Sequence, residues 1–221
     1  MGAAQAAPFL LGEAAIAEDH IVRDLAALEA LYGAVGGASA LKEVGYIHPH
    51  YARLIEASPF AVLATAGPDG LDASPRGDGP GFVEMVDQHT LLLPDRRGNN
   101  RIDSLRNVLH RPDVALLFLI PGIGETLRVN GRAEITVDPA LLARFTIDGR
   151  APRSVLRIHV QSVFFQCSRA VIRAGLWDPA RYLERSALPS TGSILAAVTQ
   201  ERIDAETYDR ELPPRLAATL Y

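Results

Sequence analysis

The spacing of hydrophobic and polar residues changes near residue 60. Between Glu13 and Tyr32, apolar residues recur every three to five positions with charged residues between them, which is the period of an amphipathic helix. A second short helix is predicted over 49–57, because a proline occupies its first position and its apolar residues share one face. From Phe60 onward, short apolar runs alternate with tight turns such as Pro68-Asp69-Gly70. The pattern predicts a helical start followed by a β region.

The β region contains many short strands. A helix over 100–110, ended by Pro112, and a shorter one over 139–145 interrupt them. The segment 114–120 is almost wholly apolar. The segment 126–137 has the mixed alternation of a strand with one solvent-exposed face. Strands this short, joined mainly by hairpin-length turns, indicate an antiparallel barrel with peripheral helices, a mainly β (α+β) fold. The predicted strands cover residues 60–65, 71–74, 81–86, 90–93, 114–120, 126–137 and 154–165.

We expect one main domain with helical additions at both ends. The chain has 221 residues, 48% of them apolar, which suffices for a substantial core without metals or disulfides. Neither an internal repeat nor a low-complexity linker divides it. The predicted organisation is a helical extension over 1–45, a barrel domain over 46–185 and a helical tail over 186–221 packed on the same domain.

Composition and charge exclude several classes of protein. A formal charge of −4 disfavours nucleic acid as a partner, because phosphate backbones select net basic surfaces. The single cysteine, Cys167, permits no intrachain disulfide and fits a reducing cytoplasm. The stretch 1–11 lacks the basic start of a signal peptide, and no apolar run is long enough for a membrane span. The histidines have no metal-like spacing, so no metal site is expected.

Three segments contain more polar and conformationally special residues than a barrel requires. In the first, 74–81, two prolines and three glycines fix an unusual path between strands and aim Arg76 rigidly. Two interpretations remain open for it, a stiff loop with one solvated arginine or part of an anion site.

The second segment, 93–101, leads from a strand end through a glycine-containing turn into a helix. Free amides at the helix start would face the turn beside asparagine and arginine donors, as in a phosphate cradle. Arg97, Arg101 and Arg76 could converge on one anion if the two loops adjoin. The alternative is an ordinary surface helix with solvated arginines.

The third segment, 166–177, carries two arginines on one face of a predicted helix. Arg169 and Arg173 stand four residues apart, and the only tryptophan, Trp177, follows them. Cys167 has no histidine or aspartate at informative spacing, so we interpret it as a small packing residue rather than a nucleophile.

Five motifs, in order and at consistent spacing, resemble a bacterial subgroup of the pyridoxamine 5′-phosphate oxidase-like FMN-binding proteins. The resemblance covers about residues 48–180. Its residues are Ser58-Pro59-Phe60-Ala61-Val62-Leu63-Ala64-Thr65, Asp72-Ala73-Ser74-Pro75-Arg76-Gly77-Asp78, Pro94-Asp95-Arg96-Arg97-Gly98-Asn99-Asn100-Arg101, Phe118 to Gly131 and Cys167 to Trp177.

The resemblance implies a six-stranded split barrel that forms a homodimer, with FMN in a groove lined by both subunits. It places Arg76, Asn100 and Arg101 near the phosphate, and residues 166–177 on the flavin of the partner subunit. One departure is Arg169, where relatives often have lysine; it keeps the charge and changes the reach. The implied FMN-binding residues are Ser74, Pro75, Arg76, Gly77, Pro94, Asp95, Arg96, Arg97, Asn99, Asn100, Arg101, Gln166, Cys167, Arg169, Arg173 and Trp177.

The implied function is an FMN-dependent oxidase or reductase acting on a small organic substrate, with pyridoxamine phosphate one possibility. Flavin supplies the hydride chemistry, so no protein nucleophile is required, and no catalytic residue is assigned. Arg169 or Arg173 is the candidate for stabilising the negative charge of reduced flavin. Two alternatives stay open, a non-catalytic flavin-binding or flavin-sensing module and a barrel that uses deazaflavin or haem.

Overall fold

A computed structural model describes residues 20–221, and the chain divides into two units, Met1–Ala40 and Leu41–Tyr221. In the first unit, helix α1 (Leu25–Tyr32) begins at Asp24, whose side chain accepts a hydrogen bond from the amide of Ala27 at 2.8 Å. The part of the predicted 13–32 helix before residue 20 lies outside the described residues. A short helix, α2 (Gly37–Leu41), follows.

The second unit is built on one antiparallel sheet of seven strands, in the order β2-β1-β5-β6-β7-β4-β3. The six strands implied by the family resemblance are therefore wrong in number, whereas the seven strand segments predicted from the local pattern agree with the sheet. The shortest strand, β3, pairs only with β4 and forms one edge of the sheet. The strands are β1 (Phe60–Gly67), β2 (Gly70–Gly77), β3 (Glu84–Asp87), β4 (Thr90–Asp95), β5 (Asp113–Leu119), β6 (Thr126–Thr136) and β7 (Ser154–Gln166).

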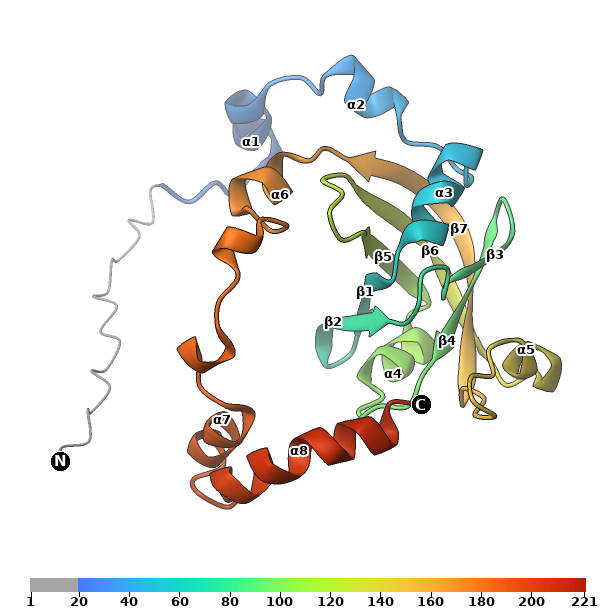
Figure 1. Cartoon of the computed structure of the whole chain (residues 1–221). Coiled ribbons are helices and arrows are strands. Elements are labelled where there is room, and N and C mark those ends of the chain that lie inside the picture. Colours follow the sequence, from blue (N-terminus) through green and yellow to red (C-terminus); the bar gives the residue numbers. More distant parts are fainter. Residues whose placement is uncertain (1–19) are drawn as a thin grey trace. The chain divides into compact units, whose positions relative to one another are not determined.

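The sheet curves around its main core (Figure 1), and a second small cluster contains Leu92, Phe145 and Val155. Leu63 of β1 and Leu93 of β4 belong to the same buried cluster, although three strands separate β1 from β4 in the sheet order. Alternation along the strands places these residues inside, as in β5, where every second side chain is buried. The edge strands β2 and β3 do not pair with each other, so the sheet is curled but not closed by hydrogen bonds.

Helices cover the ends of the curled sheet. The predicted helix over 49–57 is confirmed as α3 (Pro49–Ala57), which buries Ala52 and Ile55 in the core. The predicted 100–110 helix begins later, as α4 (Asp103–His110), because Asn100 has a φ of 61°, outside the right-handed helical region. The remaining helices are α5 (Pro139–Arg144), α6 (Arg169–Ala174), η2 (Pro179–Arg181), η3 (Arg185–Ala187), α7 (Thr191–Val198) and α8 (Ala205–Thr219).

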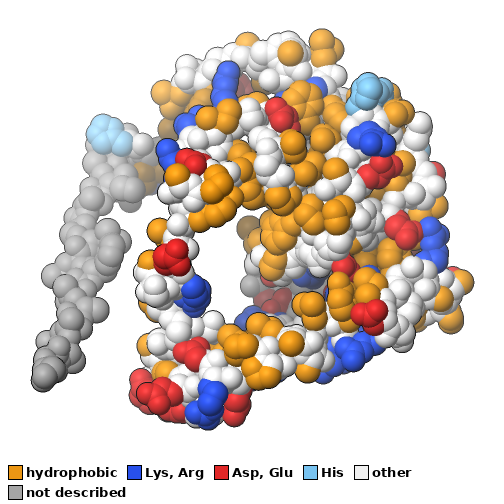
Figure 2. Space-filling model, in the orientation of Figure 1, with side chains coloured by type: hydrophobic (Ala, Val, Ile, Leu, Met, Phe, Trp, Pro, Cys, Tyr) orange, Lys and Arg blue, Asp and Glu red, His pale blue; other side chains and the backbone are white. Residues whose placement is uncertain are grey.

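Hydrophobic side chains remain on the surface of the described chain (Figure 2). On β1 and β5, the residues that point away from the core are apolar except Asp113, and Val62 pairs with Leu117 there, both partly exposed. Among residues 20–221, no helix is long and apolar enough to cross a bilayer.

Candidate anion-binding site

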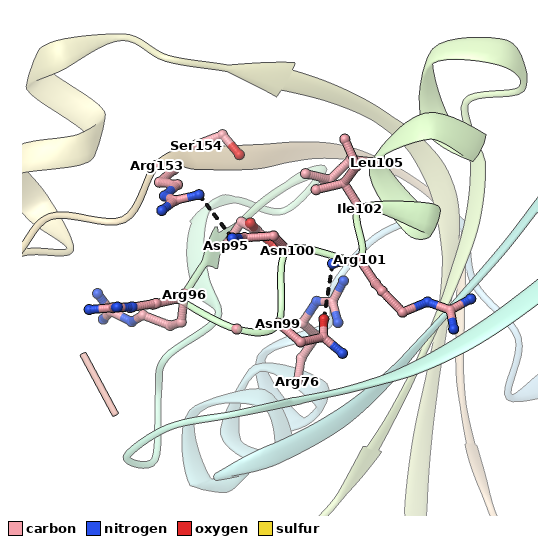
Figure 3. Close-up of a pocket in the computed structure, with 12 residues that line it drawn as sticks. Arg76, Asp95, Arg96, Asn99, Asn100, Arg101, Ile102, Leu105, Arg153 and Ser154 are labelled. Carbon is pink, nitrogen blue, oxygen red and sulfur yellow. Dashed lines mark hydrogen bonds between the residues drawn. The ribbon is translucent and has the colours of Figure 1, made fainter. Parts of the chain in front are cut away.

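Five arginines line one cavity of about 180 Å³ in the Leu41–Tyr221 unit (Figure 3). The cavity lies where β2 and β4 end and β7 begins, around the turn that leads into α4. Its lining residues are Arg76, Asp95, Arg96, Arg97, Gly98, Asn99, Asn100, Arg101, Ile102, Leu105, Arg153 and Ser154.

Strand register brings these segments together. Asp95, the last residue of β4, pairs with Ser154, the first residue of β7, so Arg153 lies beside the 96–101 loop. On the other side, Arg76 near the end of β2 donates a hydrogen bond to the Ser104 hydroxyl of α4 at 3.1 Å. The two loops therefore adjoin, as the phosphate-cradle hypothesis required.

A polar network holds the Arg76 side chain. Its Nη1 donates to the carbonyl oxygen of Pro75 at 3.0 Å, and its Nη2 donates to Ser104, which is buried. The Ser104 hydroxyl in turn donates to the carboxylate of Asp72, which also accepts from the Ser74 hydroxyl at 2.9 Å. Alternation along β2 places Asp72, Ser74 and Arg76 on one face, so this geometry follows from the strand itself.

The turn before α4 is shaped by two asparagines. The side-chain oxygen of Asn99 accepts a hydrogen bond from the amide of Arg101 at 3.0 Å, and Asn100 adopts the left-handed region that asparagine tolerates. The side chain of Arg153 donates to the Asn100 side-chain oxygen at 3.0 Å and so joins β7 to the turn.

The five arginines differ in what they already bind. Arg96 is nearly buried and is held by the carboxylate of Asp78, at 2.8 Å, and by the carbonyl of Phe145. Arg101 pairs with Asp103 at 2.9 Å, and its side chain points away from Arg153 (Figure 3).

Three arginines remain as donors for a ligand. Arg97 makes no hydrogen bond or ion pair with any residue in 20–221. Arg76 and Arg153 bind only neutral oxygens, those of Pro75, Ser104 and Asn100. A cavity with three guanidinium groups that lack a bound carboxylate favours an anion, above all a phosphate.

Asp95 is the one acidic residue in the lining. Partial burial raises the pKa of its carboxyl group above the usual value, and the nearby charges of Arg76 and Arg153 oppose that rise.

The cavity gathers seven of the sixteen predicted cofactor-binding residues. Ser74, Pro75, Gly77 and Pro94 do not line it; Ser74 instead supports the Arg76 network, and Pro94 is buried. The seven are Arg76, Asp95, Arg96, Arg97, Asn99, Asn100 and Arg101.

The predicted residues of 166–177 lie elsewhere in the protomer. They follow the far end of β7, whose 13 residues separate its ends by roughly 40 Å at strand rise. Trp177 donates from its indole nitrogen to the carbonyl of Ile123 at 2.8 Å, and the Gln166 side chain accepts from Thr126 at 3.3 Å. Within one protomer, Arg169 and Arg173 therefore do not share a site with Arg76.

The prediction that Cys167 packs against other residues is wrong. Its side chain is exposed, between the end of β7 and α6, so it is not a packing residue.

Five lining residues were not among those predicted from the sequence, namely Gly98, Ile102, Leu105, Arg153 and Ser154. Gly98 lies within the recognised motif, Ile102 directly follows it and Leu105 lies one helical turn further on. Arg153 stood at the predicted start of a strand, but only the pairing of β4 with β7 brings it to the site, and a sequence motif does not encode that pairing.

The cavity suits one kind of chemistry better than others. A volume of about 180 Å³ accommodates a phosphate group with a short polar chain, and a three-ring system would have to extend outside it. Within residues 20–221, no group of three or more histidine, cysteine, aspartate or glutamate side chains could hold a metal ion.

Comparisons with known proteins identify a family and several similar structures. Residues 47–167, slightly more than half of the chain, match the family model described as pyridoxamine 5′-phosphate oxidase. A search of curated proteins finds no match. Among solved structures, HupZ from Group A Streptococcus is 22% identical, with a TM-score of 0.46, covering 55% of this chain and 95% of that one.

Two further structures are similar at lower scores. General stress protein 26 from Bacillus anthracis is 17% identical, with a TM-score of 0.40, covering 52% of this chain and 88% of that one. A FAD-binding protein from Mesorhizobium loti is 20% identical, with a TM-score of 0.38, covering 52% and 89%. On the family match, which includes every residue that lines the arginine-rich cavity, this chain belongs to the pyridoxamine 5′-phosphate oxidase family.

Proposed function

We propose that this protein is a homodimeric, cytoplasmic FMN-dependent oxidoreductase that acts on a small organic molecule. The observation that carries the proposal is the cavity lined by Arg76, Arg97 and Arg153, none of which forms an ion pair with a carboxylate. The family indicates a flavin cofactor. The three arginines would bind the phosphate of FMN.

The donors fit the phosphate end of FMN. Arg76 is held in place by Ser104, and Arg153 by Asn100, so both guanidinium groups are positioned before any ligand arrives. Arg97, which is exposed, would add a third charge-assisted contact. The carboxyl group of Asp95, deeper in the same cavity, could accept a hydrogen bond from a ribityl hydroxyl.

The outer face of β1 and β5 supports the homodimer. An apolar strand is normally covered on both faces, and only the inner face of β5 is covered by the core. A second copy on that outer face would cover it. It could also bring its own 166–177 segment to this cavity, which one protomer cannot do.

The residues of the chain would bind, orient and stabilise, while bound FMN would accept or donate the hydride. The three arginines would hold the phosphate and thereby fix the position of the ring. Arg169 or Arg173 of a second copy would stabilise negative charge on the reduced ring.

The absorbance spectrum of the purified protein tests the cofactor class. FMN gives two bands in the near-ultraviolet and blue, whereas haem gives one intense Soret band, and a deazaflavin lacks the FMN pattern. Reduction of the bound flavin by NADH or NADPH, with turnover of a substrate, would favour an enzyme. Bound FMN that no donor reduces would favour a flavin-sensing module instead. Pyridoxamine phosphate added to the FMN-loaded protein, with hydrogen peroxide measured, tests that compound as the substrate.

The arginine donors can be tested singly. Arg97→Met should weaken FMN binding about tenfold or more, since it removes one charge-assisted hydrogen bond worth about 1.5 to 3 kcal/mol. Arg106→Met is the matched control, an exposed arginine on α4 that does not line the cavity. Equal FMN affinity in both variants would contradict the assignment of Arg97.

A further inference from the structure

We infer that a second cavity, at the other end of β7, binds a small planar aromatic anion. Its volume is about 500 Å³, well within the range of small-molecule sites. Phe165 lines it, whereas Ser154 lines the arginine-rich cavity, and the two residues lie roughly 35 Å apart along β7. The two cavities are therefore separate in one protomer.

The cavity has rigid walls before any ligand binds. One wall is the strand-like segment around Val44, which exchanges two backbone hydrogen bonds with Val163 of β7, at 3.1 and 2.8 Å. Another is α3, tied to the same segment by the Tyr51 hydroxyl, which donates to the carbonyl of Lys42 at 2.7 Å. Preformed walls spare a ligand the cost of ordering them.

Aromatic rings form much of the wall. Tyr51 and Phe165 have ring centroids 6.3 Å apart at an interplanar angle of 56°, and His48 lies edge-on to Tyr51 at 6.2 Å. Leu54 adds an aliphatic surface. Rings and aliphatic carbons in a slot of this size favour a flat apolar ligand, because aromatic pairs gain from offset and edge contacts.

Lys42 determines the charge of the ligand. Its ammonium group lies 4.7 Å from the centroid of the Phe165 ring, and it forms no ion pair with any carboxylate in residues 20–221. A cation without an ion-pair partner against an apolar wall gains from an anion that enters the cavity. The one acidic lining residue, Glu125, also lines the neighbouring cavity beside Trp177, so it stands at the boundary between the two.

The position of this cavity connects it to the proposed function. Gln166, the residue after Phe165, begins the segment that would reach the flavin of a second copy. If that proposal holds, on which this step rests, the aromatic anion is the substrate that lies against the ring. Binding of the anion itself depends on the cavity alone.

Binding is tested with three ligands that share one ring system, namely 2-naphthoate, 2-naphthalenemethanol and 2-naphthylmethylammonium, titrated into the full-length protein. We expect naphthoate to bind about tenfold more tightly than the ammonium compound, with the alcohol between them. Equal affinities, or tighter binding of the ammonium compound, would overturn the inference.

Lys42→Met removes the charge and keeps the length of the side chain. It should weaken naphthoate binding about fivefold and remove its advantage over the alcohol. Arg53→Met, on the exposed face of α3, is the matched control and should leave all three affinities unchanged. Unchanged naphthoate binding in Lys42→Met would overturn the role of Lys42.

Naphthoate added to the FMN-loaded protein separates the two proposals. We expect it to shift the visible flavin spectrum. Naphthoate that binds without altering that spectrum would overturn its assignment as a substrate analogue. A failure of FMN to bind at all would overturn the proposed function and leave the cavity result standing.

Discussion

Arg76 is positioned by a neutral hydroxyl rather than by a carboxylate. Ser104 stands between Arg76 and Asp72, so the negative charge of Asp72 orients the donor without pairing with it directly. A direct ion pair would compete with an incoming phosphate, whereas a hydroxyl relay leaves most of the guanidinium charge available. The same logic applies to Arg153, which is held by the amide oxygen of Asn100.

Ser104→Ala should therefore weaken FMN binding about fivefold, because it removes a hydrogen bond worth about 1 kcal/mol from the positioned Arg76. Isothermal titration measures the change. Ser193→Ala, an exposed serine of α7, is the control for loss of a hydroxyl. If Ser104→Ala bound FMN as tightly as the wild type, the hydrogen bond from Ser104 to Arg76 would not matter for FMN binding.

Asp95→Asn should stabilise the protein at neutral pH. The pKa of Asp95 is raised in the folded state, so folding takes up a proton and stability falls as the pH rises through that pKa. The asparagine side chain does not ionise, so the variant does not lose this stability as the pH rises. Thermal unfolding at several pH values should show a higher midpoint for the variant at pH 7, and a difference that shrinks as the pH is lowered toward 4. A variant less stable at pH 7 would contradict the assignment.

At the scale of elements, buried polar contacts fix α4 against β1. The side-chain amide of Asn107 donates to the Thr65 hydroxyl at 3.0 Å in a buried position. Gly67 lies directly beneath, where an added Cβ would come within 2.0 Å of the Asn107 side-chain oxygen. Because α4 carries Ser104, this anchor also fixes one side of the arginine-rich cavity.

The long β6–β7 ladder depends on one glycine. The register shifts between Asn130 and Gly131, and a Cβ on Gly131 would meet the backbone oxygen of His159 at 2.3 Å. Gly131→Ala should therefore cost about 1 to 3 kcal/mol of unfolding free energy, since backbone must move to relieve the contact. Urea unfolding measures it.

Gly79→Ala is the matched control for that substitution, because no atom lies within 4 Å of its added Cβ. It should lie within about 0.5 kcal/mol of the wild type. If the two variants were equally stable, the close approach at the bulge would have no energetic role.

Much of the fold could be predicted from periodicity and turn residues. The α3 helix and the regions of all seven strands follow from local patterns, since proline, glycine and alternating side chains act within a few residues. The start of α4 could not be predicted, because it depends on the left-handed conformation of Asn100. The number six came from the family resemblance alone, whereas the local pattern had predicted seven strand segments.

The site was predictable where one motif supplies several residues, as with Arg97, Asn99 and Asn100. It was not predictable where strand pairing supplies them, as with Arg153, which reaches the cavity only through β4 and β7. The separation of the 166–177 segment from Arg76 is likewise a property of the length of β7.

At the scale of the whole molecule, the outer face of β1 and β5 should be a subunit interface. Leu117→Arg places a charge at the centre of that face and should shift the protein from dimer to monomer in sedimentation velocity, with weaker FMN binding as a result. Leu109→Arg, at a side chain of α4 that is 77% exposed and does not belong to that sheet face, is the control and should leave the dimer intact. A wild-type protein that sediments as a monomer would contradict this interface.

The most direct test concerns the proposed binding of a flavin phosphate by the arginine-lined cavity. FMN and riboflavin differ only in that phosphate, so titrating both into the wild type and into an Arg97→Met/Arg153→Met double variant tests the claim directly. We predict that the wild type binds FMN about a hundredfold or more tightly than riboflavin, from two or more charge-assisted contacts, and that the double variant loses most of that preference. Equal affinity of the wild type for the two flavins would contradict the account.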